Sequence, residues 1–231
     1  MGNMEALYNT WKAIGTSGGD LSFFQNFFVK FYQAFIEADR WLQYLNGVKT
    51  TLLVTALALI LGVALGVTVA ILRTAHDQQR PGHRNPVLAV LNLVCKIYVT
   101  VIRGTPMMVQ LLIMGFVIFA SSRNFTMIGT LTLGINSGAY VSEIVAGADV
   151  GGQGQMEAGR SLGLGYGTTM RFVIVPQAVK AILPALGNEF IVLLKDTSLI
   201  TVIGGKELLY AAQGIYNRTY EQMFPLVGTA A

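Results

Sequence analysis

One stretch of the chain, Thr51 to Leu72, reads TLLVTALALILGVALGVTVAIL and contains no charged residue. At about 1.5 Å per residue, a helix of this length crosses the roughly 30 Å hydrocarbon core of a bilayer. The whole chain agrees with such an environment, because 53% of its 231 residues are hydrophobic and only 12% are charged, against roughly 25% charged residues in soluble domains. The sequence therefore predicts an all-α, polytopic membrane protein.

Basic residues set the predicted orientation of this first span. It is followed at once by RTAHDQQRPGHRNP, a short loop with Arg73, Arg80 and Arg84. An excess of basic residues in a short loop marks the cytoplasmic side, so the span runs inward and the N-terminus is expected to be extracytoplasmic. The sixteen Lys and Arg residues form no basic stripe, so the net charge of +4 does not indicate a nucleic-acid partner.

The segment before the first span, residues 1–46, is expected to lie at the outer membrane surface. Phenylalanines recur in it at helical spacing, polar residues occupy the other faces, and Trp41 and Tyr44 follow. This pattern is typical of an amphipathic interfacial helix with an aromatic anchor. The alternative is an additional, weakly apolar span.

The next apolar block, residues 87–120, is too long for one untilted span and contains RGTP at 103–106. Proline and the residue before it disfavour an unbroken helix. Residues 87–103 are therefore expected to form one helix from the cytoplasmic surface, and MMVQLLIMGFVIFA to carry the chain outward.

Two more spans are expected, residues 127–148 running inward and residues 182–205 running outward. The first of them contains small residues of the kind that let membrane helices pack closely, namely Gly134, Ser137, Gly138, Ala139 and Ser142. The chain then ends in a new apolar run, MFPLVGTAA. We therefore expect four spans in this sequence and a fifth beyond Ala231.

A polar, glycine-rich segment, residues 149–180, lies on the predicted cytoplasmic side. It is expected to form a short helix over 154–162, ended by Gly163 in the left-handed conformation, and a second helix from Thr168 up to Pro176. Two short helices at such a corner suit docking into another protein, and the alternative is an ordinary solvated loop. The run GLGYGTT lacks the lysine of a phosphate-binding loop, so the chain is not expected to bind ATP.

At these residues the chain resembles the permease subunits of bacterial ABC importers, in the branch that takes up polar amino acids. The family signature is Glu-Ala-Ala, three residues, Gly, nine residues and Ile-x-Leu-Pro. Here it reads Glu157-Ala158-Gly159, then Gly163, then VIVP at 173–176. Further matching runs, spread over residues 103–199, are RGTPMMVQ, NSGAYVSEI, GQMEAGRSLG and LPALGNEFIVLLKDTSL. Gly159 stands where the signature has alanine, and glycine costs about 1 kcal/mol against alanine in a helix interior.

The resemblance implies a type I ABC importer transmembrane domain over residues 47–231, in the bacterial cytoplasmic (inner) membrane. Two permease subunits, identical or different, would form a dimer, and each would rest a coupling helix on a separate ABC ATPase that binds ATP and Mg. An extracytoplasmic binding protein would deliver the amino acid, and closure of the ATPase pair would turn the permease from inward-open to outward-open. The resemblance assigns ATPase coupling to Met156, Glu157, Ala158, Gly159, Ser161, Leu162 and Gly163. No cofactor or metal is expected in this chain.

The fourth span carries charges that should not face lipid, because each costs about 2.5–3.5 kcal/mol at the bilayer centre. Glu189 and Asp196 are seven residues apart and share a helical face, and Asn188 and Lys195 repeat the spacing on the neighbouring stripe. With Glu143 of the third span, they could line a polar substrate path that favours a cationic amino acid. The alternatives are an internal ion-pair network, for example Lys195 with Glu143, or charges that reach water near the outer surface.

Other function classes have less support in the sequence. An ATPase-independent secondary transporter or channel commonly has repeated halves with paired broken helices, but we find no internal repeat, and the docking segment would have no purpose. A purely structural membrane anchor leaves the charges of the fourth span unexplained. An enzyme is not expected, because His76 and His83 have no nucleophile or metal-ligand set beside them.

Overall fold

The computed structural model describes residues 2–79, 85–147 and 152–230. In these ranges the chain forms helices joined by turns, which confirms the all-α prediction. Arg80 and Arg84 of the basic loop, His83 and the first residues of the segment 149–180 lie outside the described residues. The described residues form two compact units, one up to Thr51 and from Gly204 on, the other Leu52–Ile203.

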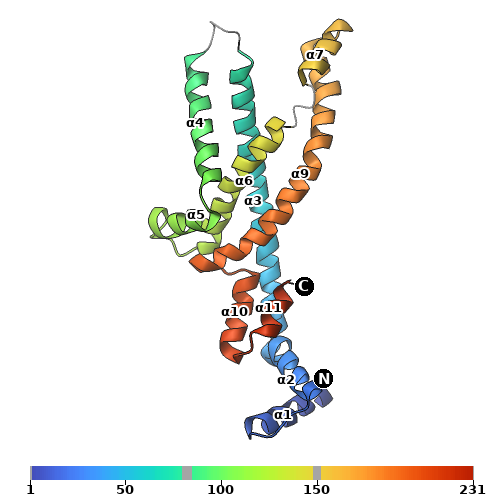
Figure 1. Cartoon of the computed structure of the whole chain (residues 1–231), viewed down its shortest axis with the longest axis vertical. Coiled ribbons are helices and arrows are strands. Elements are labelled where there is room, and N and C mark those ends of the chain that lie inside the picture. Colours follow the sequence, from blue (N-terminus) through green and yellow to red (C-terminus); the bar gives the residue numbers. More distant parts are fainter. Residues whose placement is uncertain (1, 80–84, 148–151, 231) are drawn as a thin grey trace. The chain divides into compact units, whose positions relative to one another are not determined.

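The second unit contains the predicted spans and the predicted coupling segment. Besides most of the long helix α3 (Arg40–Asp77), it comprises α4 (Pro86–Gly104), α5 (Met107–Ile113), the π-helix η2 (Met114–Ile118), α6 (Phe125–Gly147), α7 (Gly152–Ser161), α8 (Tyr166–Thr169), the π-helix η3 (Met170–Ile174), α9 (Val175–Asp196) and the 3-10 helix η4 (Thr197–Ile203). Helix α6 is central in this unit, because it contacts α4, α5, α9 and η4 (Figure 1). The largest buried apolar cluster joins Val54, Ala58, Leu111, Ile128, Leu133, Leu193, Ile200 and Ile203.

Three helical runs among the described residues are long and apolar enough to cross a membrane: Glu37–Asp77, Pro86–Gly104 and Tyr166–Ile203. They contain the first predicted span, the part of the second that precedes the RGTP break, and most of the fourth. Helix α6, the remaining one, has 23 residues, which is roughly 35 Å at about 1.5 Å per residue. Its Gly, Ser, Thr and Asn residues lower its mean hydropathy, and most of them are buried or half-buried against neighbouring helices. A helix enclosed in this way does not need the apolar surface of a lipid-facing helix.

Helices α3 and α6 approach each other closely through glycines on both sides. A Cβ built on Gly66 of α3 would lie 2.6 Å from the Cβ of Val141, and Gly62 is covered as closely by α6. Gly134 and Gly138 of α6 are in turn covered by side chains of α3 and its neighbours. Each helix thus contributes glycines four residues apart, the spacing that permits close packing of membrane helices. The sequence prediction included the α6 glycines and missed Gly62 and Gly66.

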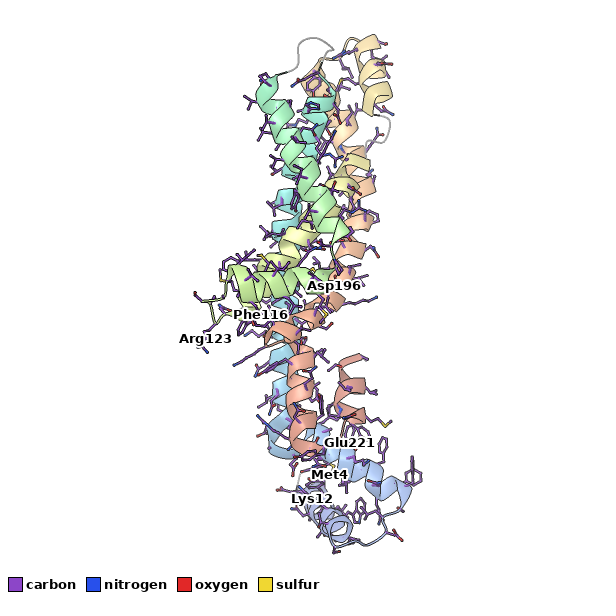
Figure 2. The ribbon with its side chains drawn as sticks, turned by 60° about the vertical axis from the view of Figure 1, so that its left-hand side comes forward. Met4, Lys12, Phe116, Arg123, Asp196 and Glu221 are labelled. Carbon is purple, nitrogen blue, oxygen red and sulfur yellow. The ribbon has the colours of Figure 1, made fainter. Side chains whose placement is uncertain are left out.

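The chain breaks after α4 at RGTP, as predicted, but it does not continue outward. Residues 107–118 form α5 and η2, and Figure 1 shows this arm lying across the axis of α4 instead of extending it. The change of direction occurs at Thr105, which is extended with φ −112° and ψ 140°. Phe116 and Arg123 lie toward the tip of the arm (Figure 2).

The turn between α4 and α5 is held by the buried side chain of Gln110. Its Nε2 donates to the backbone oxygens of Ile102 and Thr105, at 2.7 and 3.1 Å. Carbonyls at the end of a helix lack an intrahelical partner, so Gln110 donates hydrogen bonds to backbone oxygens that the break in the helix would leave without one. Asn136 of α6 fixes the glutamine in turn, because its Nδ2 donates to Gln110 Oε1 at 3.1 Å.

The helix that was expected to stop at Pro176 continues instead. Helices α8, η3 and α9 form one run from Tyr166 to Asp196, with Pro176 in the first turn of α9 and Pro184 inside it. Proline removes a backbone donor and crowds the carbonyl four residues before it. The widened π-turn η3 ends two residues before Pro176, and such a turn relieves this conflict without ending the helix.

The predicted short helix is α7, and Gly163 ends it with a φ of +80°. The Leu164 N–H donates to the Gly159 oxygen and the Gly163 N–H to the Arg160 oxygen, both at 2.9 Å, which is the bond pair of a Schellman motif. Gly159 faces Thr169 of α8, and a Cβ at Gly159 would lie 2.5 Å from both Cγ2 and Oγ1 of Thr169. The close packing against Thr169 therefore explains why glycine stands at position 159 instead of the alanine of the signature.

The first unit combines α1 (Gly2–Thr16), α2 (Phe23–Phe35), η1 (Glu37–Asp39), the start of α3, α10 (Leu208–Thr219) and α11 (Met223–Ala230). The predicted amphipathic helix is α2, which packs against α1, α10 and α11. Helix α1 was not predicted. The rings of Tyr8 and Tyr32 stack at 4.4 Å, and Lys30 of α2 pairs with Glu221 at 2.9 Å. That residues 1–46 lie at the outer membrane surface stays a prediction.

The close contact between α3 and α6 predicts that Gly66→Leu destabilises the protein. The new side chain would overlap Val141, and overpacking of this kind costs about 1–3 kcal/mol. We expect a lower midpoint of thermal unfolding in detergent. Ala64→Leu is the matched control, because Ala64 is exposed on the same helix. Equal midpoints for the two variants would contradict the contact.

The contact between α7 and α8 predicts that Gly159→Ala loosens α7, although alanine favours a helix by about 1 kcal/mol. The new Cβ would clash with Thr169, so amide hydrogen exchange at Leu164 should become faster. Adding Thr169→Ala removes the two clashing atoms and should restore much of the protection. Slower exchange in the single variant would show that the clash does not occur.

Candidate functional site

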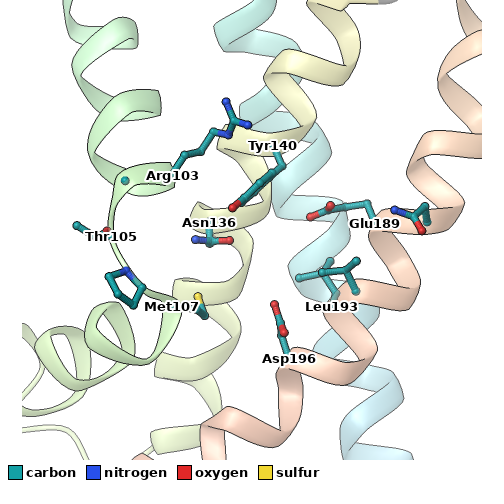
Figure 3. A pocket seen from close by; sticks show the side chains of 12 residues that line it. Arg103, Thr105, Met107, Asn136, Tyr140, Glu189, Leu193 and Asp196 are labelled. Carbon is teal, nitrogen blue, oxygen red and sulfur yellow. The ribbon is translucent and has the colours of Figure 1, made fainter.

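A cavity of about 650 Å³ lies in the second unit, where the α4–α5 turn and α9 face each other with α6 between them (Figure 3). It is lined by Arg103, Gly104, Thr105, Pro106, Met107, Asn136, Tyr140, Asn188, Glu189, Val192, Leu193 and Asp196. Its volume falls within the roughly 300–1,000 Å³ of small-molecule sites, and such sites combine apolar walls with a few placed polar groups. The cavity is therefore suited to a small polar molecule.

Helix α9 brings three of the five predicted pathway residues to this cavity: Asn188, Glu189 and Asp196. The two carboxylates reach the same cavity because seven residues are about two turns of a helix. Glu189 is only 7% exposed and Asp196 is half-buried. Neither carboxylate pairs with a basic side chain among the described residues. Buried charges normally have a partner, so this wall can accept hydrogen bonds from a cationic or donor group.

The other two predicted pathway residues, Glu143 and Lys195, do not line the cavity. Glu143 forms an ion pair with Arg103, through Oε2 and Nη1, and Lys195 is exposed. Of the alternatives considered from the sequence, an internal ion pair at Glu143 does form, but its partner is Arg103 and not Lys195. The sequence led us to expect three carboxylates and a lysine along the path. The cavity is lined instead by two carboxylates and one guanidinium.

Three further lining residues, Arg103, Asn136 and Tyr140, were not predicted from the sequence. The Arg103 guanidinium carbon lies 5.1 Å from the centre of the Tyr140 ring, a favourable cation–π distance. Both residues belong to runs that carried the family resemblance, RGTPMMVQ and NSGAYVSEI. The position of Arg103 inside the apolar block 87–120 was the signal available in the sequence. That the two runs meet at one cavity is seen only in the fold.

The predicted coupling residues lie in α7 and at its C-terminal end. Gly159 is buried and Met156 is half-buried, whereas the exposed members are Glu157, Ala158, Ser161, Leu162 and Gly163. Leu162 is 80% exposed. An exposed leucine beside a well-ended helix is compatible with a contact surface for another protein.

Comparison with known proteins identifies the family. Residues 87–231 match the family described as binding-protein-dependent transport system inner membrane component. The glutamine transport system permease protein GlnP of Escherichia coli K12 is 37% identical over 179 residues, covering 74% of this chain and 75% of that protein. The putative glutamine transport system permease protein GlnP of Rickettsia prowazekii is 34% identical over 187 residues, covering 79% and 81%.

Solved structures agree with this match. The crystal structure of an amino acid ABC transporter with histidines is 40% identical, with a TM-score of 0.69, and covers 81% of this chain and 84% of that chain. An inward-facing structure of the MetNI methionine ABC transporter shares the fold, with a TM-score of 0.64 at 21% identity over 83% and 90% of the two chains. The chain therefore belongs to the family of binding-protein-dependent transport system inner membrane components and is a permease subunit of an ABC importer.

Proposed function

We propose that this permease subunit imports a polar amino acid whose side chain donates hydrogen bonds, and that the cavity lies on its path. The observation that carries the proposal is the pair of carboxylates, Glu189 and Asp196, on one wall of a cavity of amino-acid size. One carboxylate can accept from the α-ammonium group and the other from the side chain. Glutamine, histidine, lysine and arginine side chains all have donors, which widens the cationic preference expected from the sequence.

The names of related proteins support this class of substrate. The relatives from Escherichia coli and Rickettsia are named for glutamine transport, and the related solved structure is an amino acid transporter with histidines. Both amino acids have a side chain that donates hydrogen bonds. Glutamine is therefore the first substrate to test, with histidine and arginine as competitors.

Coupling to ATP is assigned to α7. We infer that Glu157, Ala158, Ser161 and Leu162 contact a separate ABC ATPase subunit, which binds ATP and Mg. Helix α7 lies at the same end of the second unit as the end of α3 and the start of α4 (Figure 1), and Arg73 of α3 is at that end. Basic residues mark the cytoplasmic side, which supports a cytoplasmic α7 and an extracytoplasmic N-terminus.

The remaining partners follow from the mode of transport. A binding-protein-dependent importer receives its substrate from an extracytoplasmic binding protein, and we propose a second permease subunit beside this one. An ATPase-independent secondary transporter or channel is not favoured, because the matched family and the amino acid relatives are components of ABC systems.

The cavity proposal predicts lower uptake for Glu189→Gln and for Asp196→Asn. Each loses a hydrogen bond to a charged group, worth about 1.5–3 kcal/mol, so glutamine uptake at limiting substrate should fall about 10-fold or more. The measurement is ATP-driven uptake into proteoliposomes with the ATPase, the binding protein and the full permease. Asp20→Asn, an exposed carboxylate of the first unit, should transport normally. Unchanged uptake and unchanged competition by histidine and arginine in both variants would exclude the site.

The coupling proposal predicts that Gly163→Val abolishes ATP-driven uptake and releases the ATPase during purification. Valine disfavours the φ of +80° at this position, so α7 would lose its C-terminal cap. Gly165→Ala is the control, because Gly165 has open space around its Cα and an ordinary φ of −67°.

Glu157→Arg tests the contact surface itself, because Glu157 is exposed and arginine favours a helix about as well as glutamate does. It should weaken ATPase binding, whereas Glu5→Arg in exposed α1 should not. Transport that continues without any ATPase would overturn the proposal.

A further inference from the structure

Arg103 is the one basic residue among the side chains that line the cavity in the described part of the chain. It lies in the last turn of α4, whereas Glu189 and Asp196 come from α9. Figure 3 shows these groups on different elements around the same space. The cavity therefore has a positive wall and a negative wall.

An α-amino acid carries the complementary pair of charges on its main chain, a carboxylate and an ammonium group. We propose that the Arg103 guanidinium binds the α-carboxylate of the transported amino acid, and that Glu143 is a positioning residue that keeps Arg103 on its own wall. The proposal rests on the amino acid import proposed above and goes further by assigning the two ends of the substrate to two walls.

The chemistry of arginine fits this task. A guanidinium has five N–H donors in a planar fork that matches a carboxylate. The contact with Glu143 uses Nη1, so further donors remain for a second carboxylate. The Tyr140 ring at 5.1 Å supports the guanidinium without competing for those donors.

Glu143 has a separate role because it pairs with Arg103 without lining the cavity. The two carboxylates of α9 attract the same guanidinium from across the cavity. Without Glu143, Arg103 would be drawn toward them and would block both walls at once. The side chains of Arg103 and Glu143 are 39% and 41% exposed, and exposed ion pairs contribute only about 0–1 kcal/mol, so the pair adds little stability by itself.

The test is ligand binding to the permease–ATPase complex in nanodiscs without the binding protein, measured by saturation-transfer NMR. The probes are L-glutamine and L-glutaminamide, which keeps the amine and replaces the carboxylate by an uncharged amide. Arg103→Gln should weaken glutamine binding about 10-fold or more and change glutaminamide binding less than about twofold. Arg103→Lys keeps the positive charge but lacks the planar set of N–H donors, so its preference for glutamine over glutaminamide should be intermediate. Arg123→Gln, an exposed arginine outside the cavity, is the matched control.

Glu143→Gln should give a different result, a weaker affinity for both probes. In the double variant Arg103→Gln and Glu143→Gln, affinities should equal those of Arg103→Gln alone, because Glu143 acts through Arg103. A merely structural glutamate would weaken binding further in the double variant. Co-purification of the ATPase and the thermal unfolding midpoint identify variants that fail to fold.

Three outcomes would overturn the inference. These are equal losses for glutamine and glutaminamide in Arg103→Gln, an additional loss from Glu143→Gln when Arg103 is absent, and no binding of either probe to the unaltered complex. ATP-driven glutamine uptake by the same preparations tests the proposed function separately. If uptake continues but Arg103→Gln does not change the preference for glutamine over glutaminamide, the import function is supported and this inference is wrong.

Discussion

The second unit depends on the close approach of α3 and α6. A Cβ added to Gly62 or Gly66 of α3, or to Gly134 or Gly138 of α6, would lie less than 3.0 Å from atoms of a neighbouring helix. In lipid, helices gain little from burying apolar surface against each other, so such close van der Waals contact is a main source of their association. The helices α4, α5 and α9 pack on α6, and the cavity lies between α6 and the elements attached to it.

Hydrogen bonds then fix the wall of the cavity where the helical pattern is interrupted. Gln110 satisfies backbone oxygens of the α4–α5 turn, and Asn136 links that glutamine to α6. Removing one partner of a buried polar contact leaves the other unsatisfied, at a cost of about 1–3 kcal/mol. The run RGTPMMVQ thus contains both the proline that breaks the helix and the glutamine that stabilises the turn.

Much of this architecture could be predicted from the sequence. The span Thr51–Leu72, the break at RGTP and the helix end at Gly163 all depend on local properties: apolar length, proline geometry and left-handed backbone. The errors have both local and tertiary causes. Pro176 was expected to end a helix, but a π-turn accommodates it, and the arm 107–118 turns aside because of Thr105. Helical spacing brought Glu189 and Asp196 to one face correctly. It could not reveal that Glu143 pairs with Arg103, since that contact joins helices distant in sequence.

The helical run from Tyr166 to Asp196 has a mechanical consequence. One end of it packs against α7 through Thr169 and Gly159, and the other end carries Glu189 and Asp196. Because the two carboxylates share a face, rotation of α9 about its own axis would turn both of them away from the cavity together. Such a rotation would remove the entire acidic wall in a single movement, and a bound ammonium group would lose both counter-charges at once.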